Sequence, residues 1–307
     1  MKVSVVLCTY SLDRYEEFSE AADSILDQTH DDVELVVVVD GTEEVYDRVL
    51  ADYGDHEDTV IHCNDRNRGL SHSRNVGAEL ASGDVVAFLD DDAVAAPDWA
   101  EKIVSGYERY DALAVGGKMV PDWLAGEPSY LPAEFYFLIG VTYRGFREDE
   151  GYVRNTFSSN LSFRRGPFLE LEGFKTHMGK RGENNLQGGE TELCVRLERE
   201  YGERVLYIPD AEIEHKIYDY RTGRRWLLER AFWQGYSKRR MEEMDSEGTE
   251  TERAFVGKLF STFIPDRIAE LVREPTAERA GRLVMLLVLT GATGIGYGYA
   301  LAKSLLE

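Results

Sequence analysis

The sequence predicts an open, doubly wound α/β fold, and two observations lead to that expectation. Over the first 117 residues, short apolar segments typical of strands alternate with segments of helical spacing. One apolar segment, residues 33–39, is nearly all valine, as expected for a strand buried on both faces of a parallel sheet. Strands that alternate with helices in this way favour a layered structure around such a sheet.

The individual elements are expected from local patterns. Runs of Val, Ile, Leu and Phe predict strands at residues 3–7, 33–39, 59–62, 85–89 and 112–115. Helical spacing predicts helices at residues 15–26, 70–81 and 98–109, the last preceded by Pro97. Beyond residue 116 the alternation fades and aromatic residues and glycines increase. We therefore expect a first lobe at 1–117, a second lobe at 118–220, and C-terminal helices at 221–307.

Composition excludes some classes of protein. The 307 residues carry 57 Asp and Glu against 35 Lys and Arg, only nine of them Lys, for a net charge of -22. Such a chain repels phosphate backbones, so we expect no nucleic-acid partner. An acid excess with little lysine is typical of proteins that stay soluble in concentrated salt, which predicts a halophilic source. The three cysteines show neither metal spacing nor a disulfide framework, as expected in a reducing compartment.

Residues 283–302 form a run of 20 residues without a charge, long enough to cross a membrane. Tyr297 near one end and Arg282 before the other favour a membrane location. A buried C-terminal helix is the alternative, and the glycines of the run would also let it lie shallowly or pair with another helix. Four arginines precede the run and one lysine follows it, which predicts that the rest of the chain faces the cytoplasm. The arginines are Arg267, Arg273, Arg279 and Arg282.

Polar and acidic residues follow three of the expected strands. These triplets are Cys8-Thr9-Tyr10, Asp40-Gly41-Thr42 and Asp90-Asp91-Asp92. In an open parallel sheet, ligands bind beyond the carboxyl ends of the strands, so these residues should converge on one site. Clustered carboxylates repel one another unless a cation compensates them, and Mg²⁺ or Mn²⁺ with substrate phosphates would do so. A solvated acidic turn is the alternative.

Several longer motifs carry a resemblance to a known family. They are VSVVLCTYSLDR, VVVVDGTEE, NRGLSHSRNVGAELASGD, AFLDDDA and SSNLSFRR, followed by the pair Gly173-Phe174. In this order, over about residues 2–240, the chain resembles family 2 glycosyltransferases of the inverting GT-A type. The resemblance implies a GT-A fold, the Rossmann-like open sheet of nucleotide-diphospho-sugar transferases, with residues 118–220 as its acceptor lobe.

The resemblance also implies a role for individual residues. Thr9, Tyr10 and Asp40 match the segments that hold the nucleobase, and Arg74 lies in the segment that matches the family's Arg-Asn helix. Asp90 would contact the ribose, Asp92 would bind the ion, and Asp91 between them would serve the donor or acceptor. Asn160 would help frame the transferred sugar, and His215 matches a histidine close to the diphosphate or metal.

The catalytic base is expected at the start of a helix. The family commonly reads Glu-Asp-x-Glu-Leu there, whereas this chain has Gly189-Glu190-Thr191-Glu192-Leu193. The alignment makes Glu190 the base, with Glu192 in reserve, because a carboxylate can accept an alcohol proton as attack begins. Alternatively, both acids only stabilise a helix N-terminus through its dipole. The glycine at 189 departs from the family pattern and supports a non-catalytic sugar-nucleotide-binding protein as a rival.

Together these features resemble haloarchaeal members of the family that extend dolichol-linked glycans for N-glycosylation of surface (S-layer) proteins. That resemblance implies a nucleotide-sugar donor, UDP-linked and carrying a hexuronic acid, a lipid-linked glycan acceptor, and a divalent cation, Mg²⁺ or Mn²⁺. It implies a cell-membrane location with the catalytic domain in the cytoplasm. A dolichyl-phosphate sugar synthase, whose acceptor is a phosphate, is a second rival.

Overall fold

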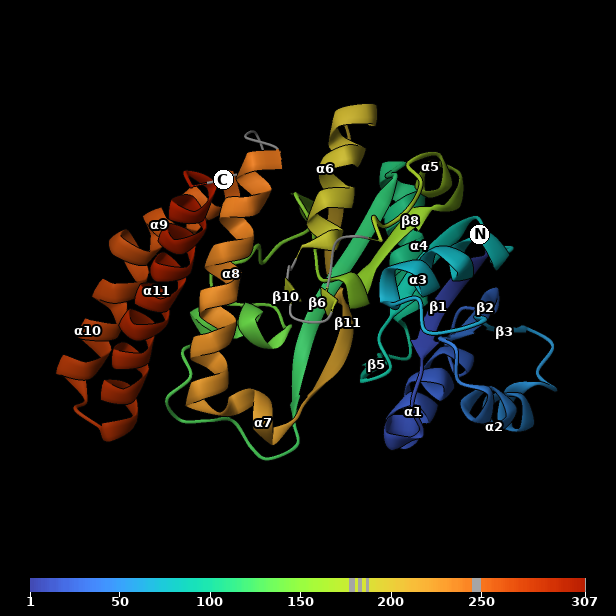
Figure 1. Ribbon diagram of the computed structural model, residues 1–307, viewed down its shortest axis with the longest axis horizontal. Coiled ribbons are helices and arrows are strands. Elements are labelled where there is room, and N and C mark those ends of the chain that lie inside the picture. Colours follow the sequence, from blue (N-terminus) through green and yellow to red (C-terminus); the bar gives the residue numbers. More distant parts are fainter. Residues whose placement is uncertain (177–179, 182–183, 186–187, 245–249, 307) are drawn as a thin grey trace. The chain divides into compact units, whose positions relative to one another are not determined.

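The computed structural model describes residues 1–176, 180–181, 184–185, 188–244 and 250–306, and the chain divides into two compact units. The first unit comprises Met1–Val120, Asp149–Arg181 and Gly189–His215. The second comprises Pro121–Glu148, Gly182–Gly188 and Lys216–Glu307. Nearly all strands belong to the first unit, and the long C-terminal helices belong to the second (Figure 1).

The described strands, in chain order, are β1 (Val3–Thr9), β2 (Val33–Val39), β3 (Thr59–Cys63), β4 (Val85–Leu89), β5 (Ala93–Ala95), β6 (Ala114–Trp123), β7 (Gly151–Val153), β8 (Leu161–Arg164), β9 (Lys180–Arg181), β10 (Asn184–Asn185) and β11 (Val205–Ile217). The described α-helices are α1 (Tyr15–Leu26), α2 (Glu43–Tyr53), α3 (Leu70–Leu80), α4 (Trp99–Tyr110), α5 (Arg165–Glu170), α6 (Gly189–Tyr201), α7 (Asp219–Thr222), α8 (Arg224–Met244), α9 (Glu250–Lys258), α10 (Ile264–Arg273) and α11 (Ala277–Ser304). The 3₁₀ helices are η1 (Leu12–Arg14), η2 (Ala133–Ile139) and η3 (Ser158–Asn160), and η5 (Leu259–Phe263) is a π-helix.

One large sheet has the strand order β3-β2-β1-β4-β8-β6-β11-β5, with β7 paired to β11. Its first half is parallel, since β1 pairs with β2 and β4, and β2 pairs with β3. Its second half turns antiparallel where β8 pairs with β4 and β6. The predicted α/β fold with a parallel sheet is confirmed for the first half. The strand expected at 112–115 is longer than predicted, because β6 continues to Trp123.

Burial explains why the strands are so apolar. The β2 residues from Leu35 to Val39 are all fully buried, as expected for a central strand with helices on both faces. Glu34 is the exception, and its buried carboxylate accepts hydrogen bonds from the Ser4 hydroxyl at 2.6 Å and the Ser82 amide at 2.8 Å. The partners keep this charge tolerable inside the sheet.

Helix α2 was not predicted from the sequence, and its composition explains why. Of its 11 residues only Val45, Val49 and Tyr53 are buried, one side chain per turn among charged neighbours. A stripe this narrow gives a weak periodic signal. The ring of Tyr53 packs edge-on against Phe18 of α1 at 5.9 Å between centroids, and this tertiary contact stabilises the helix.

Candidate active site

The carboxyl ends of three parallel strands lie side by side in the first unit. Thr9 of β1 is level with Val39 of β2, and Leu7 of β1 is level with Leu89 of β4. The amide of Asp40 also donates a 2.8 Å hydrogen bond to the carbonyl of Thr9. The register therefore places the three predicted triplets at one edge of the sheet, as the sequence predicted. Thr9 is buried there, whereas the Tyr10 side chain is exposed.

Asp40 is buried and organises the loop that follows β3. Its carboxylate oxygens accept three hydrogen bonds of 2.8 Å, from the Asn64 side-chain amide and the backbone amides of Arg68 and Gly69. Gly41 next to it has a φ of 78°, and a Cβ there would lie 2.1 Å from the carbonyl carbon of Arg66. This loop therefore passes so closely over the Asp40-Gly41 turn that only glycine fits.

Arg74 of α3 carries its charge to the acidic strand end. The side chain is buried, pairs with the carboxylate of Asp90, and lies against the rings of Phe88 and Phe174 at 5.9 and 5.5 Å from their centroids. The backbone amide of Asp90 donates a hydrogen bond to the Ser159 hydroxyl at 2.9 Å. The ion pair with Arg74 and the backbone hydrogen bond to Ser159 together fix the position of the Asp90 carboxylate.

Asp92 and His215 meet although they are distant in the sequence. His215 on β11 pairs with Ala93 of β5, which directly follows Asp92. This pairing brings the imidazole Nε2 to 3.3 Å from Asp92 Oδ1, with both side chains buried. The two residues predicted to bind the metal are therefore adjacent.

Arg14 of η1 is a site residue that the sequence reasoning did not select. Its guanidinium lies 3.6 Å from Asp92 Oδ2 and 3.9 Å from Asp91 Oδ1. Burial, together with the neighbouring charges of Asp92 and Asp90, raises the pKa of Asp91 from 3.8 to about 7, and Arg14 partly opposes that effect. The strand end therefore concentrates negative charge and attracts cations. Arg14 stands inside the first quoted motif, at the end of VSVVLCTYSLDR, which was the available signal.

The donor set at this strand end suits a divalent cation. Asp92 offers a carboxylate and His215 an imidazole, a combination that Mn²⁺ accepts when phosphate oxygens and water complete the shell. Among the described residues no three His, Cys, Asp or Glu side chains gather as a preformed metal cage. Asp92 and His215 are therefore the residues that would hold such an ion together with phosphate oxygens.

The pair Gly173-Phe174 is clasped by Asn75 of α3. The Asn75 amide donates to the Phe174 carbonyl, and its oxygen accepts from the Phe174 amide, both at 2.8 Å. Gly173 has a φ of 58°, and a Cβ there would lie 2.4 Å from the Asn75 oxygen. Two motifs that are far apart in the sequence are thus one structural feature.

Asn160 is fully buried and joins three elements. Its side-chain oxygen accepts from the indole of Trp99 at 3.0 Å, and its amide donates to the carbonyls of Lys118 at 3.0 Å and Ala211 at 2.8 Å. The amide group therefore ties α4, β6 and β11 together behind the acidic strand end. Its expected part in placing the transferred sugar stays a prediction, and this geometry makes that part indirect.

Glu190 and Glu192 both lie in the first turn of α6 but differ in their contacts. The Glu192 carboxylate forms a bidentate pair with Arg196, at 2.7 and 2.8 Å. Arg196 also donates to the carbonyl of Gly173 at 2.6 Å, so this pair anchors α6 to the Gly173 turn. Among the described residues, no hydrogen bond or ion pair to the Glu190 carboxylate is formed. Of the two acids, Glu192 is thus the one whose oxygens are occupied by a partner within the described part of the chain.

Cys8 lies near the end of β1, at this edge of the sheet. Burial raises the pKa of the Cys8 thiol to about 12, so the sulfur stays protonated at neutral pH.

The first unit combines an open α/β sheet with an acidic strand end, a histidine and a cationic helix residue, which is the arrangement of a nucleotide-sugar transferase.

Comparisons with known proteins agree with this class. Residues 4–171 match the model of glycosyl transferase family 2. A glucosyl-dolichyl phosphate glucuronosyltransferase of Haloferax volcanii is 49% identical over 302 residues, covering 98% of this chain and 96% of the relative. The chain therefore belongs to glycosyltransferase family 2, and it is a glycosyltransferase.

Solved structures share the fold. The S. aureus TarS fragment 1–349 in complex with UDP-GlcNAc has a TM-score of 0.57 at 15% identity, covering 95% of this chain and 82% of that one. GalNAc-T7 with UDP, GalNAc and Mn²⁺ has a TM-score of 0.55 at 15% identity, covering 80% of this chain and 51% of that one. The expected GT-A fold is confirmed.

Proposed function

We propose that this enzyme transfers a hexuronic acid from a UDP-linked donor to a hydroxyl of a dolichol-phosphate-linked sugar, with inversion, in the N-glycosylation of surface proteins. The observation that carries the proposal is the 49% identity to the Haloferax volcanii enzyme over 98% of the chain. That relative is named for a glucuronosyl group and a glucosyl-dolichyl phosphate acceptor. The matched region spans the strand-end motifs and the acceptor lobe alike.

The nucleotide half of the donor would bind at residues 1–117. Thr9 and Tyr10 end β1, and Asp40 holds the neighbouring loop, so these residues would shape the place of the nucleobase. Asp90 would contact the ribose, and its partly buried ion pair with Arg74 keeps the carboxylate in one position. Asp91 would face the donor sugar or the acceptor.

Asp92 and His215 would hold Mg²⁺ or Mn²⁺ together with the diphosphate. Such an ion stabilises the negative charge that develops on the leaving diphosphate. Arg14 lies against the same carboxylates, and it would contribute a second positive charge to that region. The histidine is buried beside Asp92, so its position is fixed before substrate binds.

Glu190 would act as the catalytic base in a single displacement. Its carboxylate accepts the proton of the acceptor hydroxyl while that oxygen attacks the anomeric carbon. The bond from this carbon to the diphosphate oxygen breaks on the opposite face, and the electron pair leaves with the diphosphate. Glu192 is a weaker candidate because Arg196 occupies both of its oxygens.

The acceptor would bind in the lobe at residues 118–220 while its lipid stays in the membrane. The apolar α11 supports a membrane location, because it is a helix long and apolar enough to enter a bilayer. Nucleotide-sugar donors are cytoplasmic metabolites, so the catalytic residues would face the cytoplasm.

A donor and acceptor screen tests the proposal. Purified full-length protein would be incubated with Mn²⁺, UDP-glucuronic acid and glucosyl-phosphoryl-dolichol, with UDP release and lipid-linked product both measured. We expect a disaccharide-lipid whose new linkage has the opposite anomeric configuration to the donor. Product on dolichyl phosphate itself would instead identify a dolichyl-phosphate sugar synthase. Tight donor binding without product on any acceptor would point to a non-catalytic sugar-nucleotide-binding protein.

A further inference from the structure

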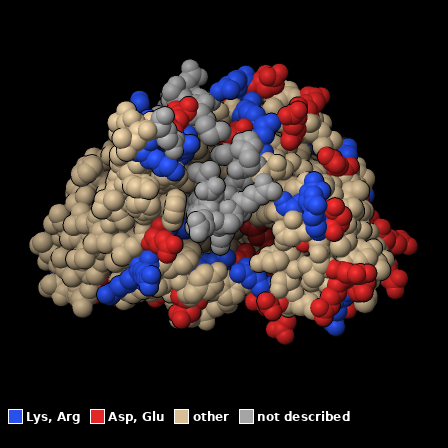
Figure 2. Space-filling view, viewed as in Figure 1, with Lys and Arg blue, Asp and Glu red and all other residues tan. Residues whose placement is uncertain are grey.

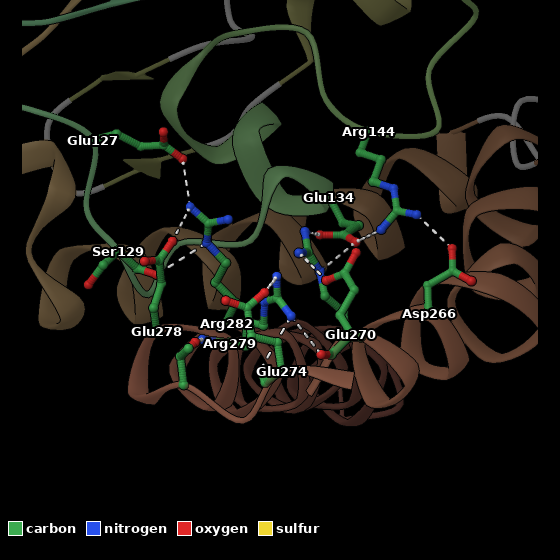
Figure 3. A network of polar contacts seen from close by, with 12 residues as sticks. Glu127, Ser129, Glu134, Arg144, Asp266, Glu270, Glu274, Glu278, Arg279 and Arg282 are labelled. Atoms are coloured by element: carbon green, nitrogen blue, oxygen red, sulfur yellow. Dashed lines mark hydrogen bonds and ion pairs between the residues drawn. The ribbon is translucent and has the colours of Figure 1, made fainter. Parts of the chain in front are cut away.

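Helix α10 in the second unit turns a charged face inward. Arg267 is buried and donates to both carboxylate oxygens of Glu134, at 3.1 and 2.9 Å. Figure 3 labels Glu134 among its polar contacts. Glu134 is itself fully buried and also accepts from Arg144 at 2.9 Å. Arg144 reaches back to Asp266 of α10 at 2.6 Å. These paired charges fix which side of α10 faces the protein.

The opposite side of α10 is apolar and exposed. Ile268 and Val272, one turn apart, are 47% and 76% exposed. Val256 of α9 and Phe260 of η5, which precede α10, are also exposed. Surface helices of soluble proteins normally bury such residues and expose the charged ones. α10 reverses that order, which calls for an apolar environment outside the protein.

Helix α11 continues the apolar surface. Its buried side includes Met285, Leu286 and Leu289. Its outward side has exposed apolar side chains about every turn, and these are Val284, Leu287, Val288, Ile295, Tyr299 and Leu301. Arg279 at its start donates to the carbonyl of Glu270, which joins α11 to α10. Figure 2 shows a broad area without charged side chains over α10 and α11.

The buried side of α11 lies along α8 in the second unit (Figure 1). Two glycines allow the contact: a Cβ on Gly296 would lie 1.9 Å from the Phe232 carbonyl oxygen, and one on Gly235 would lie 1.9 Å from that of Thr293. The Tyr297 hydroxyl also donates to Glu242 of α8 at 2.5 Å. The two helices therefore pack backbone to backbone and are joined by this hydrogen bond.

This packing is incompatible with a membrane-spanning α11. Nine of the 21 residues of α8 are Lys, Arg or Glu, distributed over both halves of the helix. If α11 crossed a bilayer, α8 beside it would lie in the hydrocarbon core with those charges, which is strongly unfavourable. The arginines that suggested a cytoplasmic flank are also engaged elsewhere, since Arg267, Arg279 and Arg282 form ion pairs with Glu134, Glu274 and Glu127.

Charge along the sequence agrees with contact to a lipid surface. Residues 216–307 contain 15 Lys and Arg against 13 Asp and Glu, whereas residues 1–215 contain 20 against 44. The strong acidity of the chain is thus absent from the part that carries the apolar surface. Arg253, Lys258 and Arg273 are exposed on α9 and α10 and would meet anionic headgroups.

We propose that α9, η5, α10 and α11 present one apolar surface that inserts into a single leaflet, with α11 lying in the membrane plane and not crossing it. This inference rests on the proposed function, because a lipid-linked acceptor would then be met at the interface where the enzyme lies. Amphipathic helices with basic borders bind membranes in this way. A second copy of the chain covering the same surface is the competing occupant, and the test separates the two.

The first experiment is flotation with vesicles of equal parts phosphatidylglycerol and phosphatidylcholine in molar KCl. We expect full-length protein to float, and Ile268→Glu to reduce vesicle binding by at least 10-fold. Leu50→Glu in α2 is the matched control, since Leu50 is also 47% exposed, and it should bind as the unaltered protein does. Undiminished flotation of Ile268→Glu would overturn the proposal. So would a dimer in light scattering that this variant converts to a monomer, without vesicle binding by either form.

The second experiment tests topology with an epitope tag added at the C-terminus. External protease should remove the tag completely from protein bound to sealed vesicles, because both ends of α11 stay on one side. A protected tag would show a spanning helix and overturn the proposal. Mn²⁺-dependent hydrolysis of the soluble donor by Ile268→Glu should remain within 2-fold of the unaltered protein. Failure of that reaction in both proteins would count against the proposed function, whereas failure of flotation alone counts against the membrane surface.

Discussion

The imidazole Nε2 of His215 lies 3.3 Å from Oδ1 of Asp92, although the two residues come from distant parts of the sequence. The antiparallel pairing of β11 with β5 creates this contact, because His215 pairs with the residue that follows Asp92. A strand of the antiparallel half thus brings an imidazole to the carboxylate that we propose holds the cation. The carboxylates come from the end of β4, and the imidazole comes from the returning strand.

Asp92→Ala should lower Mn²⁺-dependent transfer at least about 100-fold, because the carboxylate proposed to hold the ion is lost. The fold should persist, since Asp92 lies in the turn between β4 and β5 and the substitution removes only its carboxylate. Initial rates and calorimetric titration with Mn²⁺ and UDP would measure the effect. Asp55→Ala, at an exposed loop position, is the control. Turnover close to that of the control in chelator-treated buffer would exclude the metal assignment.

Glu190→Gln should reduce turnover by roughly 10²–10⁴-fold with little change in donor binding, because the amide cannot accept the acceptor proton. Glu192→Gln should retain turnover within a few-fold but lower the free energy of unfolding by about 1–2 kcal/mol, since it weakens the pair with Arg196. Steady-state rates and urea unfolding of the two variants separate the roles. The reverse pattern would transfer the base assignment to Glu192.

Asn160→Ala should lower the free energy of unfolding by about 3 kcal/mol or more. It would leave the Trp99 indole and the carbonyls of Lys118 and Ala211 buried without their hydrogen-bond partner. Urea unfolding followed by tryptophan fluorescence measures this loss. Asn67→Ala changes the same residue type at an exposed position and should be nearly neutral. An unchanged stability with lost activity would mean that Asn160 acts directly on substrate.

Gly296→Ala should destabilise the second unit by about 1–3 kcal/mol, because the added methyl group would meet the Phe232 carbonyl and force α11 away from α8. Gly291→Ala on the same helix meets no atom within 4 Å and should stabilise it by about 0.5–1 kcal/mol. Hydrogen exchange of the α8 and α11 amides and thermal unfolding provide the measurements. Equal behaviour of the two variants would show that α11 is not packed on α8.

The sequence alone determined the strands at the start of the chain and the polar residues that end them. Val33–Val39 forms β2 with the predicted bounds, because an apolar run interrupted only by Glu34 has few alternatives to a central strand. Chain order then placed Thr9, Asp40 and Asp90 at one edge, since parallel strands end on the same side. Family motifs added the residue roles, which the geometry accommodates and which the variants above would test.

Only the tertiary structure decided which charged groups pair. Glu192 resembles Glu190 in the sequence, yet its oxygens are bound by Arg196, which also holds the Gly173 turn. Arg267 looked like a flanking charge of a membrane span, but it is buried against Glu134, more than a hundred residues away. Local periodicity reports whether a helix has a polar face. Whether that face turns inward or outward depends on the residues that contact the helix, and those residues come from distant parts of the chain.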